Sequence, residues 1–332
     1  MEILKNRNEE IMNKLLSDKE VEDLSIEDKK RYYENLRDYC LQLPDNQPHF
    51  GQDLIHRVYP KLIKYQIIPE GDENIPKDKP VIFVVNHSNS HDIFTMYECL
   101  SRLGRKASAM VATDCLNPIT TTIFKASNAT LLDRMIKESR GSSVLRMAHK
   151  TYLGYDSFIC GESTWNLHPT KSMHNIKKGP VKIQAITKSL IIPTIMEYIE
   201  VDNLVQKEKD LYIKCVIRFG KPIEPDYNNS MIDQAQLITA IMSAMRKEIW
   251  KEYNITRDQL SDIDPEVYIN HTYLKKYTPL FEYKSEIEQK YLHFNEGEPH
   301  VNEYRLDANG ILVPGVTEKN DPQAIKILQK CA

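Results

Sequence analysis

Apolar positions in the middle of this chain follow two alternating periods. Short runs rich in β-branched residues have the length of strands, and they alternate with segments whose apolar positions recur every three or four residues, the period of a helix. The predicted elements, in chain order, are strand 81–85, helix 92–103, strand 107–112, helix 117–126, strand 129–132, helix 136–150, strand 156–160, helix 180–188, strand 190–196, strand 211–219 and helix 231–253. This order predicts an α/β fold with a mostly parallel central sheet flanked by helices.

The pattern differs on either side of this region. Residues 1–45 are charged and helical in period, with an apolar stripe that predicts a packing or partner face: Ile3, Leu4, Ile11, Leu15 and Leu16. Residues 66–80 are rich in prolines and predict a turn-rich approach to the first core strand, and a proline at position 193 predicts a break in the strand that contains it. We therefore expect an N-terminal helical segment (1–64), a core (65–257) and a C-terminal extension (258–332).

The end of the first core strand carries the strongest chemical signal. The run from Val81 to Val85 is followed by Asn86 and His87, and after a polar turn Asp92 opens the next predicted helix. Asp is a favoured helix N-cap, so we predict that Asp92 caps this helix and that its carboxylate returns to the ring of His87. A carboxylate that holds one imidazole nitrogen leaves the other free as a base. No serine or cysteine lies at a recognisable nucleophile elbow, which indicates that His87 deprotonates a substrate hydroxyl.

A His-x4-Asp spacing is a weak signal by itself, because a helix-capping Asp beside a surface His has the same spacing. The order of the later segments strengthens it. One predicted strand ends in Asp133-Arg134, the next ends in Glu162-Ser163-Thr164-Trp165, and a further strand contains Pro193. Sites in parallel sheets gather at the carboxyl ends of strands, so we expect His87, Arg134 and Glu162 to share one cleft.

These blocks resemble, in order and spacing, those of the glycerolipid acyltransferase family, the lysophosphatidate acyltransferase-like enzymes with a His-x4-Asp motif. The resemblance implies an acyltransferase core and the transfer of a fatty acyl group from acyl-CoA or acyl carrier protein to a hydroxyl of a lysophospholipid or glycerol phosphate acceptor, as in 1-acylglycerol-3-phosphate O-acyltransferases. It implies His87 as the general base oriented by Asp92. We expect no cofactor, and no metal on His87, His91 and Asp92, because no further His or carboxylate lies in a matching block. The residues expected to bind substrate are Asn86, Arg134, Glu162, Ser163, Thr164 and Trp165.

The chain departs from the family pattern at several positions. Asn89 occupies the place of the usual Ser, and Asn128 that of the Gly that opens the second block. The third block usually reads Glu-Gly-Thr-Arg, so Ser163 replaces its Gly and Trp165 replaces the Arg that the family implies for phosphate binding. An acceptor without phosphate, such as a sugar, a polyol or another lysolipid, is therefore an alternative. A thioester or lipid hydrolase and a non-catalytic lipid-binding homologue are two more.

Glu162 and Arg134 each have two interpretations from sequence. Glu162 binds an acceptor hydroxyl or holds Arg134, and Arg134 binds phosphate or makes a pair that shapes the site. Residues 163–196 contain no Asp or Glu but carry Lys171, Lys177, Lys178, Lys182 and Lys188. They form either a solvated face with its balancing acids elsewhere or an electropositive rim for anionic headgroups, coenzyme A or an acidic carrier protein.

Charge, cysteine content and hydropathy indicate the class of partner and the cellular compartment. The formal net charge of −3 gives no argument for a nucleic-acid partner. The cysteines are scattered, which indicates buried free thiols in a reducing compartment: Cys40, Cys99, Cys115, Cys160, Cys215 and Cys331. No window approaches the ~18–20 apolar residues that span a bilayer. We therefore expect a cytoplasmic protein, with peripheral contact at the inner face of the membrane as a further option.

Overall fold

The computed structural model describes residues 15–44, 50–62, 65–88, 91–113, 116, 118–163, 166, 171–200, 213–255, 304–306 and 312–314. The helices within these ranges are α2 (Asp18–Glu22), α3 (Ile26–Leu41), α4 (Gly51–Leu62), α5 (Asp92–Arg102), α6 (Pro118–Ala126), α7 (Lys137–Tyr152), α8 (Gly179–Thr187) and α9 (Met231–Glu252), with a short 3₁₀ helix η1 (Asp72–Asn74). The strands are β1 (Tyr65–Glu70), β2 (Ile82–Val85), β3 (Ala107–Ala112), β4 (Thr130–Leu132), β5 (Asp156–Cys160), β6 (Ile191–Glu200), β7 (Ile213–Phe219), β8 (Tyr304–Leu306) and β9 (Leu312–Pro314). Every helix and strand predicted for the core is present.

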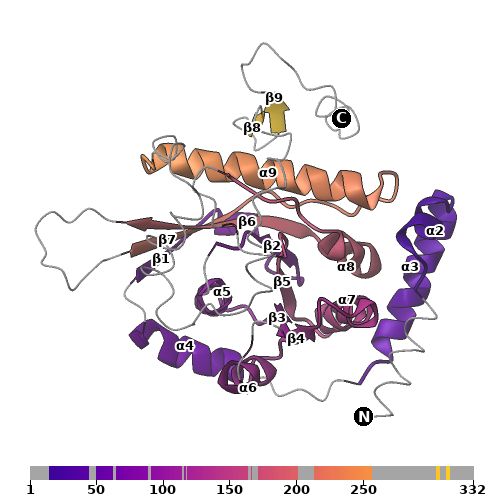
Figure 1. Cartoon of the computed structure of the whole chain (residues 1–332), viewed down its shortest axis with the longest axis horizontal. Helices are drawn as coiled ribbons and strands as arrows, with labels where there is room; N and C mark the ends of the chain where they lie inside the picture. Colours follow the sequence, from indigo (N-terminus) through magenta and orange to yellow (C-terminus); the bar gives the residue numbers. More distant parts are fainter. Residues whose placement is uncertain are drawn as a thin grey trace, which may run out of the picture.

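The core is a seven-stranded sheet in the order β1-β7-β6-β2-β5-β3-β4. The strands from β6 to β4 run parallel to one another, whereas β7 is antiparallel to β6 and parallel to β1. The expected α/β fold with a mostly parallel sheet is therefore confirmed (Figure 1). The parallel strands all end on one edge of the sheet, and residues that follow them are brought together there.

Two predictions about the strands were wrong. The segment expected to be a turn-rich approach contains β1, which pairs with β7 over its whole length. Pro193 does not break its strand, because β6 continues through it to Glu200. The carbonyl of Pro193 accepts the N–H of Gly220, just beyond the end of β7. Pairing between β6 and β7 begins at Thr194, one residue after Pro193. The proline, which has no N–H, therefore removes no hydrogen bond between these two strands.

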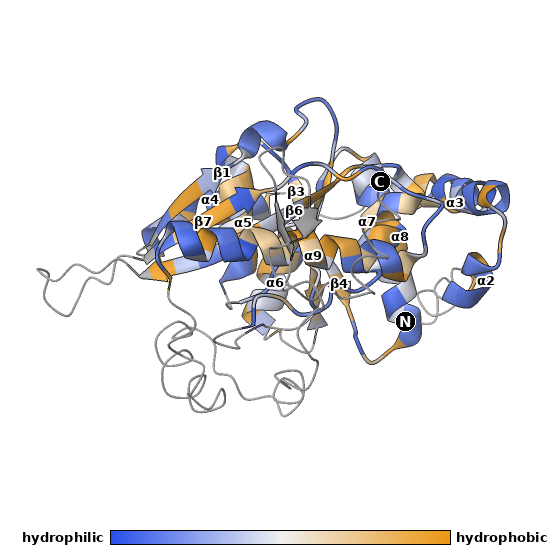
Figure 2. Cartoon of the chain, turned by 90° about the horizontal axis from the view of Figure 1, so that it is seen from above, coloured by the Kyte–Doolittle hydropathy of each residue, from blue (hydrophilic) through white to orange (hydrophobic). Residues whose placement is uncertain are grey.

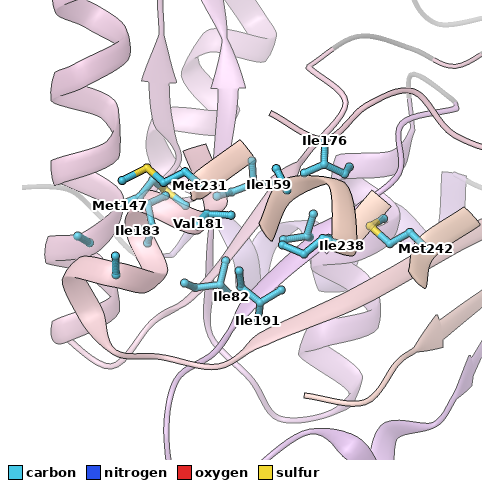
Figure 3. Close-up of a cluster of buried hydrophobic side chains, with 14 of the residues drawn as sticks. Ile82, Met147, Ile159, Ile176, Val181, Ile183, Ile191, Met231, Ile238 and Met242 are labelled. Carbon is cyan, nitrogen blue, oxygen red and sulfur yellow. The ribbon is translucent and has the colours of Figure 1, made fainter. Parts of the chain in front are cut away.

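Helices cover both faces of the sheet. Residues of β2 alternate between two hydrophobic clusters: Ile82 and Val84 pack with α3, α7, α8 and α9, whereas Phe83 and Val85 pack with α4, α5 and α6. Figure 3 shows the first cluster, in which Ile238 and Met242 of α9 lie over Ile82 and Ile191 of the central strands. The covering helices carry both hydrophilic and hydrophobic positions, as the mixed colours of α4 and α9 show (Figure 2).

The described residues of the N-terminal segment form the helices α2, α3 and α4, which pack on the core. Ser17 and Glu20 form a capping box at the start of α2, and Ser25 caps α3. Leu15 packs against the hydrophobic core beside α3, while Ile3, Leu4 and Ile11 lie outside the described residues. Among the described residues, no helix is both long and apolar enough to span a membrane. Of the C-terminal extension, the short antiparallel pair β8–β9 is described.

Candidate active site

The strand β2, the turn after it and α5 bring His87 and Asp92 together. The predicted contact is present: Nδ1 of His87 lies 2.9 Å from Oδ2 of Asp92. Because a carboxylate only accepts, Nδ1 carries the proton of this bond and Nε2 is left for other partners. One detail differs from the prediction. The N-cap of α5 is His91, and Asp92 is the first residue of the helix.

Three donors converge on the carboxylate of Asp92, which is fully buried. Besides His87, the backbone N–H of Ser88 donates to Oδ2 at 2.7 Å, and the hydroxyl of Tyr198 donates to Oδ1 at 2.8 Å. The side chain of His87 is 16% exposed, so its ring faces outward from this anchored carboxylate. The arrangement fixes the tautomer and the orientation of the ring, as a base in a catalytic site requires.

The sequence analysis missed Tyr198. It lies on β6 beyond the end predicted for that strand, on the same face as Ile192 and Met196. The alternation of apolar residues continues past Met196, and that signal could have extended the strand to Tyr198.

Glu162 is buried and joins two backbone segments. Its Oε1 accepts the N–H of His87 at 2.9 Å, and its Oε2 accepts the N–H of His174 at 2.6 Å. Burial raises the pKa of Glu162 to about 7, against the lowering effect of these two backbone bonds. Both carboxylate oxygens thus accept backbone amides, a role that the sequence did not indicate. Glu162 holds the backbone of His87 in place.

Arg134 lies near the same edge of the sheet and contacts the third block through its backbone. Its Nη1 donates to the carbonyl of Ser163 at 2.8 Å. Ser163 is exposed and adopts a left-handed backbone with φ 61°. Thr164 and Trp165 lie outside the described residues. As expected, the three predicted residues follow the carboxyl ends of parallel strands: His87 follows β2, Arg134 follows β4 and Glu162 follows β5.

Asn86 has a structural environment that the sequence did not indicate. It is fully buried, its Nδ2 donates to the carbonyl of Met196 at 3.0 Å, and its Oδ1 accepts the N–H of Met196 at 2.7 Å. Both polar atoms of its side chain therefore tie the end of β2 to β6. This bridge supports the turn that carries His87, and the substrate contact expected for Asn86 stays a prediction.

Cys160, at the end of the neighbouring strand β5, also influences the ring of His87. Burial favours the neutral ring, but interactions with Cys160 and Asp92 favour the charged form more strongly and raise the pKa of His87 to about 10. Burial lowers the pKa of the adjacent His91. The pKa values of the two histidines thus shift in opposite directions. The one with the raised pKa, His87, contacts the carboxylate of Asp92.

The lysine-rich segment has its balancing acids in the N-terminal helices. Lys178 and Lys182 pair with Asp18 of α2, and Lys188 pairs with Glu34 of α3. Lys171 is buried. For these three lysines the structure agrees with the first interpretation, a face with its balancing acids elsewhere, and the electropositive rim stays a prediction. Within the described residues, no group of three or more His, Cys, Asp or Glu side chains could hold a metal ion.

Comparison with known proteins adds three findings. A family model described as Acyltransferase matches residues 66–197. Among solved structures, the crystal structure of the 1-acyl-sn-glycerophosphate (LPA) acyltransferase PlsC from Thermotoga maritima is similar, with 16% sequence identity, coverage of 68% of this chain and 83% of that chain, and a TM-score of 0.43. No curated protein matches the chain.

Proposed function

A family model described as Acyltransferase matches residues 66–197, and on that premise we propose that the chain moves a fatty acyl group from an acyl thioester to a hydroxyl of a lysophospholipid or glycerol phosphate acceptor. The donor is acyl-CoA or an acyl carrier protein thioester. The observation that carries the proposal is the bond between His87 and the fully buried Asp92 at the carboxyl edge of the sheet.

In the proposed reaction, His87 acts as the general base. Its Nε2 removes the proton of the acceptor hydroxyl as the oxygen attacks the thioester carbonyl, and the imidazolium then protonates the leaving thiolate. Asp92 stabilises the charged ring and keeps it oriented. A positioned base of this kind typically contributes ~10²–10⁴-fold to the rate, and alignment of the two bound substrates contributes much of the remainder.

The site supports this role because the parts around His87 are fixed. Asp92 is anchored by Ser88 and Tyr198, and the backbone N–H of His87 is held by Glu162. A rigid base loses little conformational freedom when substrate binds, so such pre-organisation favours catalysis over simple binding. A non-catalytic lipid-binding protein has no need of this network.

Purified protein incubated with acyl-CoA and with acyl carrier protein thioesters, each with and without a panel of lysolipids, tests the proposed function. We expect acylated acceptor that depends on both donor and acceptor. Free fatty acid formed equally well without acceptor would show a thioester hydrolase instead. Bound but unconverted thioester would show a binding protein.

Acceptor choice is the finer part of the proposal. Trp165 stands where the family pattern has Arg, and an indole cannot neutralise a phosphate dianion. Arg134 at the same edge of the sheet is a cation that remains for this purpose. We expect lysophosphatidate to be used less well than an acceptor with a less charged headgroup.

The substitution Trp165→Arg tests this expectation. Charge-assisted contacts are worth ~1.5–3 kcal/mol each, so the variant should shift relative kcat/KM toward the phosphate monoester by about tenfold or more. The matched substitution Trp165→Gln, which adds no charge, should leave the preference unchanged. Efficient use of lysophosphatidate by the wild type, unaltered in Trp165→Arg, would contradict the proposed preference.

A further inference from the structure

A chain of side-chain hydroxyls connects Asp92 with helix α4. The hydroxyl of Tyr198 on β6 donates to Oδ1 of Asp92 at 2.8 Å and lies 3.3 Å from Oγ1 of Thr95 on α5. The same Thr95 oxygen lies 3.1 Å from the hydroxyl oxygen of Tyr59 on α4. Asp92 and Thr95 are three residues apart on α5, so their side chains share one face of that helix. Three elements that are distant in the sequence therefore meet beside the carboxylate that holds His87.

This chain of hydroxyls lies in the interior of the protein. Asp92 and Thr95 are fully buried, and Tyr59 is nearly so. The proton of the Tyr198 hydroxyl has two acceptors within reach, and the shorter bond, to the charged oxygen of Asp92, is the stronger. Burial strengthens such a bond, because the surrounding protein screens charge less than water does. Thr95, bonded in turn to Tyr59, limits the movement of the Tyr198 hydroxyl on its other side.

The geometry of the carboxylate explains what the Tyr198 hydroxyl does for the base. The carboxylate of an Asp side chain has only a broad preference for its angle about the Cβ–Cγ bond, so its contacts must fix that angle. Oδ2 of Asp92 accepts from Nδ1 of His87 and from the backbone N–H of Ser88, and Oδ1 accepts from Tyr198. Donors on both oxygens oppose rotation of the group. Without the Tyr198 hydroxyl, Oδ1 loses a bond that opposes rotation, and Oδ2 is less firmly held in line with Nδ1 of His87.

We propose that Tyr198 is a positioning residue for acyl transfer, and that Thr95 and Tyr59 support it. The proposal rests on the proposed function, in which His87 is the general base. Tyr198 acts through Asp92: it keeps the carboxylate oriented, and the carboxylate orients the ring. The expected signature is a loss in kcat without a change in KM, because the hydroxyl supports proton removal and not substrate binding.

Steady-state kinetics of Tyr198→Phe test the proposal, because this variant removes the hydroxyl and keeps the ring. We expect kcat to fall at least about tenfold, with KM for donor and acceptor within about twofold of the wild type. Thr95→Val, one bond further from Asp92, should give a smaller loss in kcat of about threefold. The matched control is Tyr97→Phe, which removes another buried hydroxyl of α5, one that bonds to backbone groups. It should keep kcat within about twofold of the wild type.

A double-mutant cycle separates positioning from a general loss of structure. In the Asp92→Ala background, the Tyr198 hydroxyl has no carboxylate to orient, so Tyr198→Phe should change kcat by less than about twofold. A further loss as large as in the wild-type background would overturn the proposal. A kcat of Tyr198→Phe equal to that of Tyr97→Phe would also overturn it.

The NMR signal of the Nδ1 proton of His87 gives a readout that does not depend on turnover. The bond to Asp92 slows exchange of this proton with water, and the signal is identified by its absence in His87→Ala. We expect the proton to exchange at least about tenfold faster in Tyr198→Phe and at the wild-type rate in Tyr97→Phe. An unchanged rate in Tyr198→Phe would contradict the proposal. If no acceptor supports transfer while this exchange result holds, the proposed function fails and the positioning of Asp92 by Tyr198 stands.

Discussion

At the scale of single residues, the site depends on how Asp92 is held. The contact with His87 could be predicted from the sequence because a strand, a turn and a helix start join residues five positions apart. The contact with Tyr198 bridges 106 positions and exists only because β6 lies beside β2 in the sheet. Sequence patterns report local geometry well, but strand order is set by long-range packing that a single sequence does not reveal.

The raised pKa of His87 gives a prediction for the pH dependence of transfer. The base must be neutral to accept a proton, and Cys160 and Asp92 hold the ring in its charged form up to a pKa of about 10. Below that pKa the neutral fraction grows about tenfold per pH unit. We therefore expect log(kcat/KM) to rise with a slope near one from about pH 6 to about pH 9, without a plateau.

Cys160→Ala is the matched variant for this profile. Removing the thiol removes one of the interactions that raise the pKa of His87, so the rising limb should move to lower pH. The contrary result is a wild-type log(kcat/KM) that is constant above pH 7 and a rising limb at the same pH in Cys160→Ala. It would show that Cys160 has no influence on the pKa of His87.

At the scale of elements, two departures from the family pattern share one backbone property. Asn128 and Ser163 stand where the family pattern has Gly, and both adopt left-handed backbone angles, φ 59° and φ 61°. Glycine is the residue that adopts such angles at least cost. The sequence shows that glycine is missing at these positions, but it does not show the left-handed backbone. The turn after β5 is therefore strained at Ser163.

Substitutions at Ser163 test this strain. A left-handed backbone costs a non-glycine residue ~1–2 kcal/mol, and the larger freedom of glycine in the unfolded chain offsets part of the gain. We expect Ser163→Gly to match or exceed the wild type in free energy of unfolding, and Ser163→Val to lose about 1 kcal/mol or more, measured by urea denaturation. Equal midpoints for the glycine and valine variants would argue against strain at this turn.

At the scale of the whole molecule, helices close both faces of the sheet, and α4 together with the residue before it presents an apolar strip outward. Phe50, Leu54 and Val58 recur every four residues and are 61%, 48% and 42% exposed. Arg57 and Lys61 are exposed on the same helix. Apolar side chains beside cations suit an anionic lipid surface. We propose α4 as a contact of this protein with an anionic membrane surface.

Binding to vesicles that contain phosphatidylglycerol measures this contact. The double substitution Leu54→Glu with Val58→Glu should weaken binding at least about tenfold, because it removes two apolar contacts and adds two negative charges. The control is Ile232→Glu at an equally exposed position on α9, which lies on the opposite face of the sheet (Figure 1). Equal binding by both variants would exclude α4 as the contact.

The most direct test of the central claim is the single-turnover rate of acyl transfer in His87→Ala and Asp92→Asn, with circular dichroism to verify that each variant is folded. The account predicts that His87→Ala loses at least about two orders of magnitude, as expected for a missing general base. It predicts a large loss for Asp92→Asn as well, because the amide no longer fixes the charge and tautomer of the ring. A folded His87→Ala protein that keeps most of the wild-type rate would contradict the account.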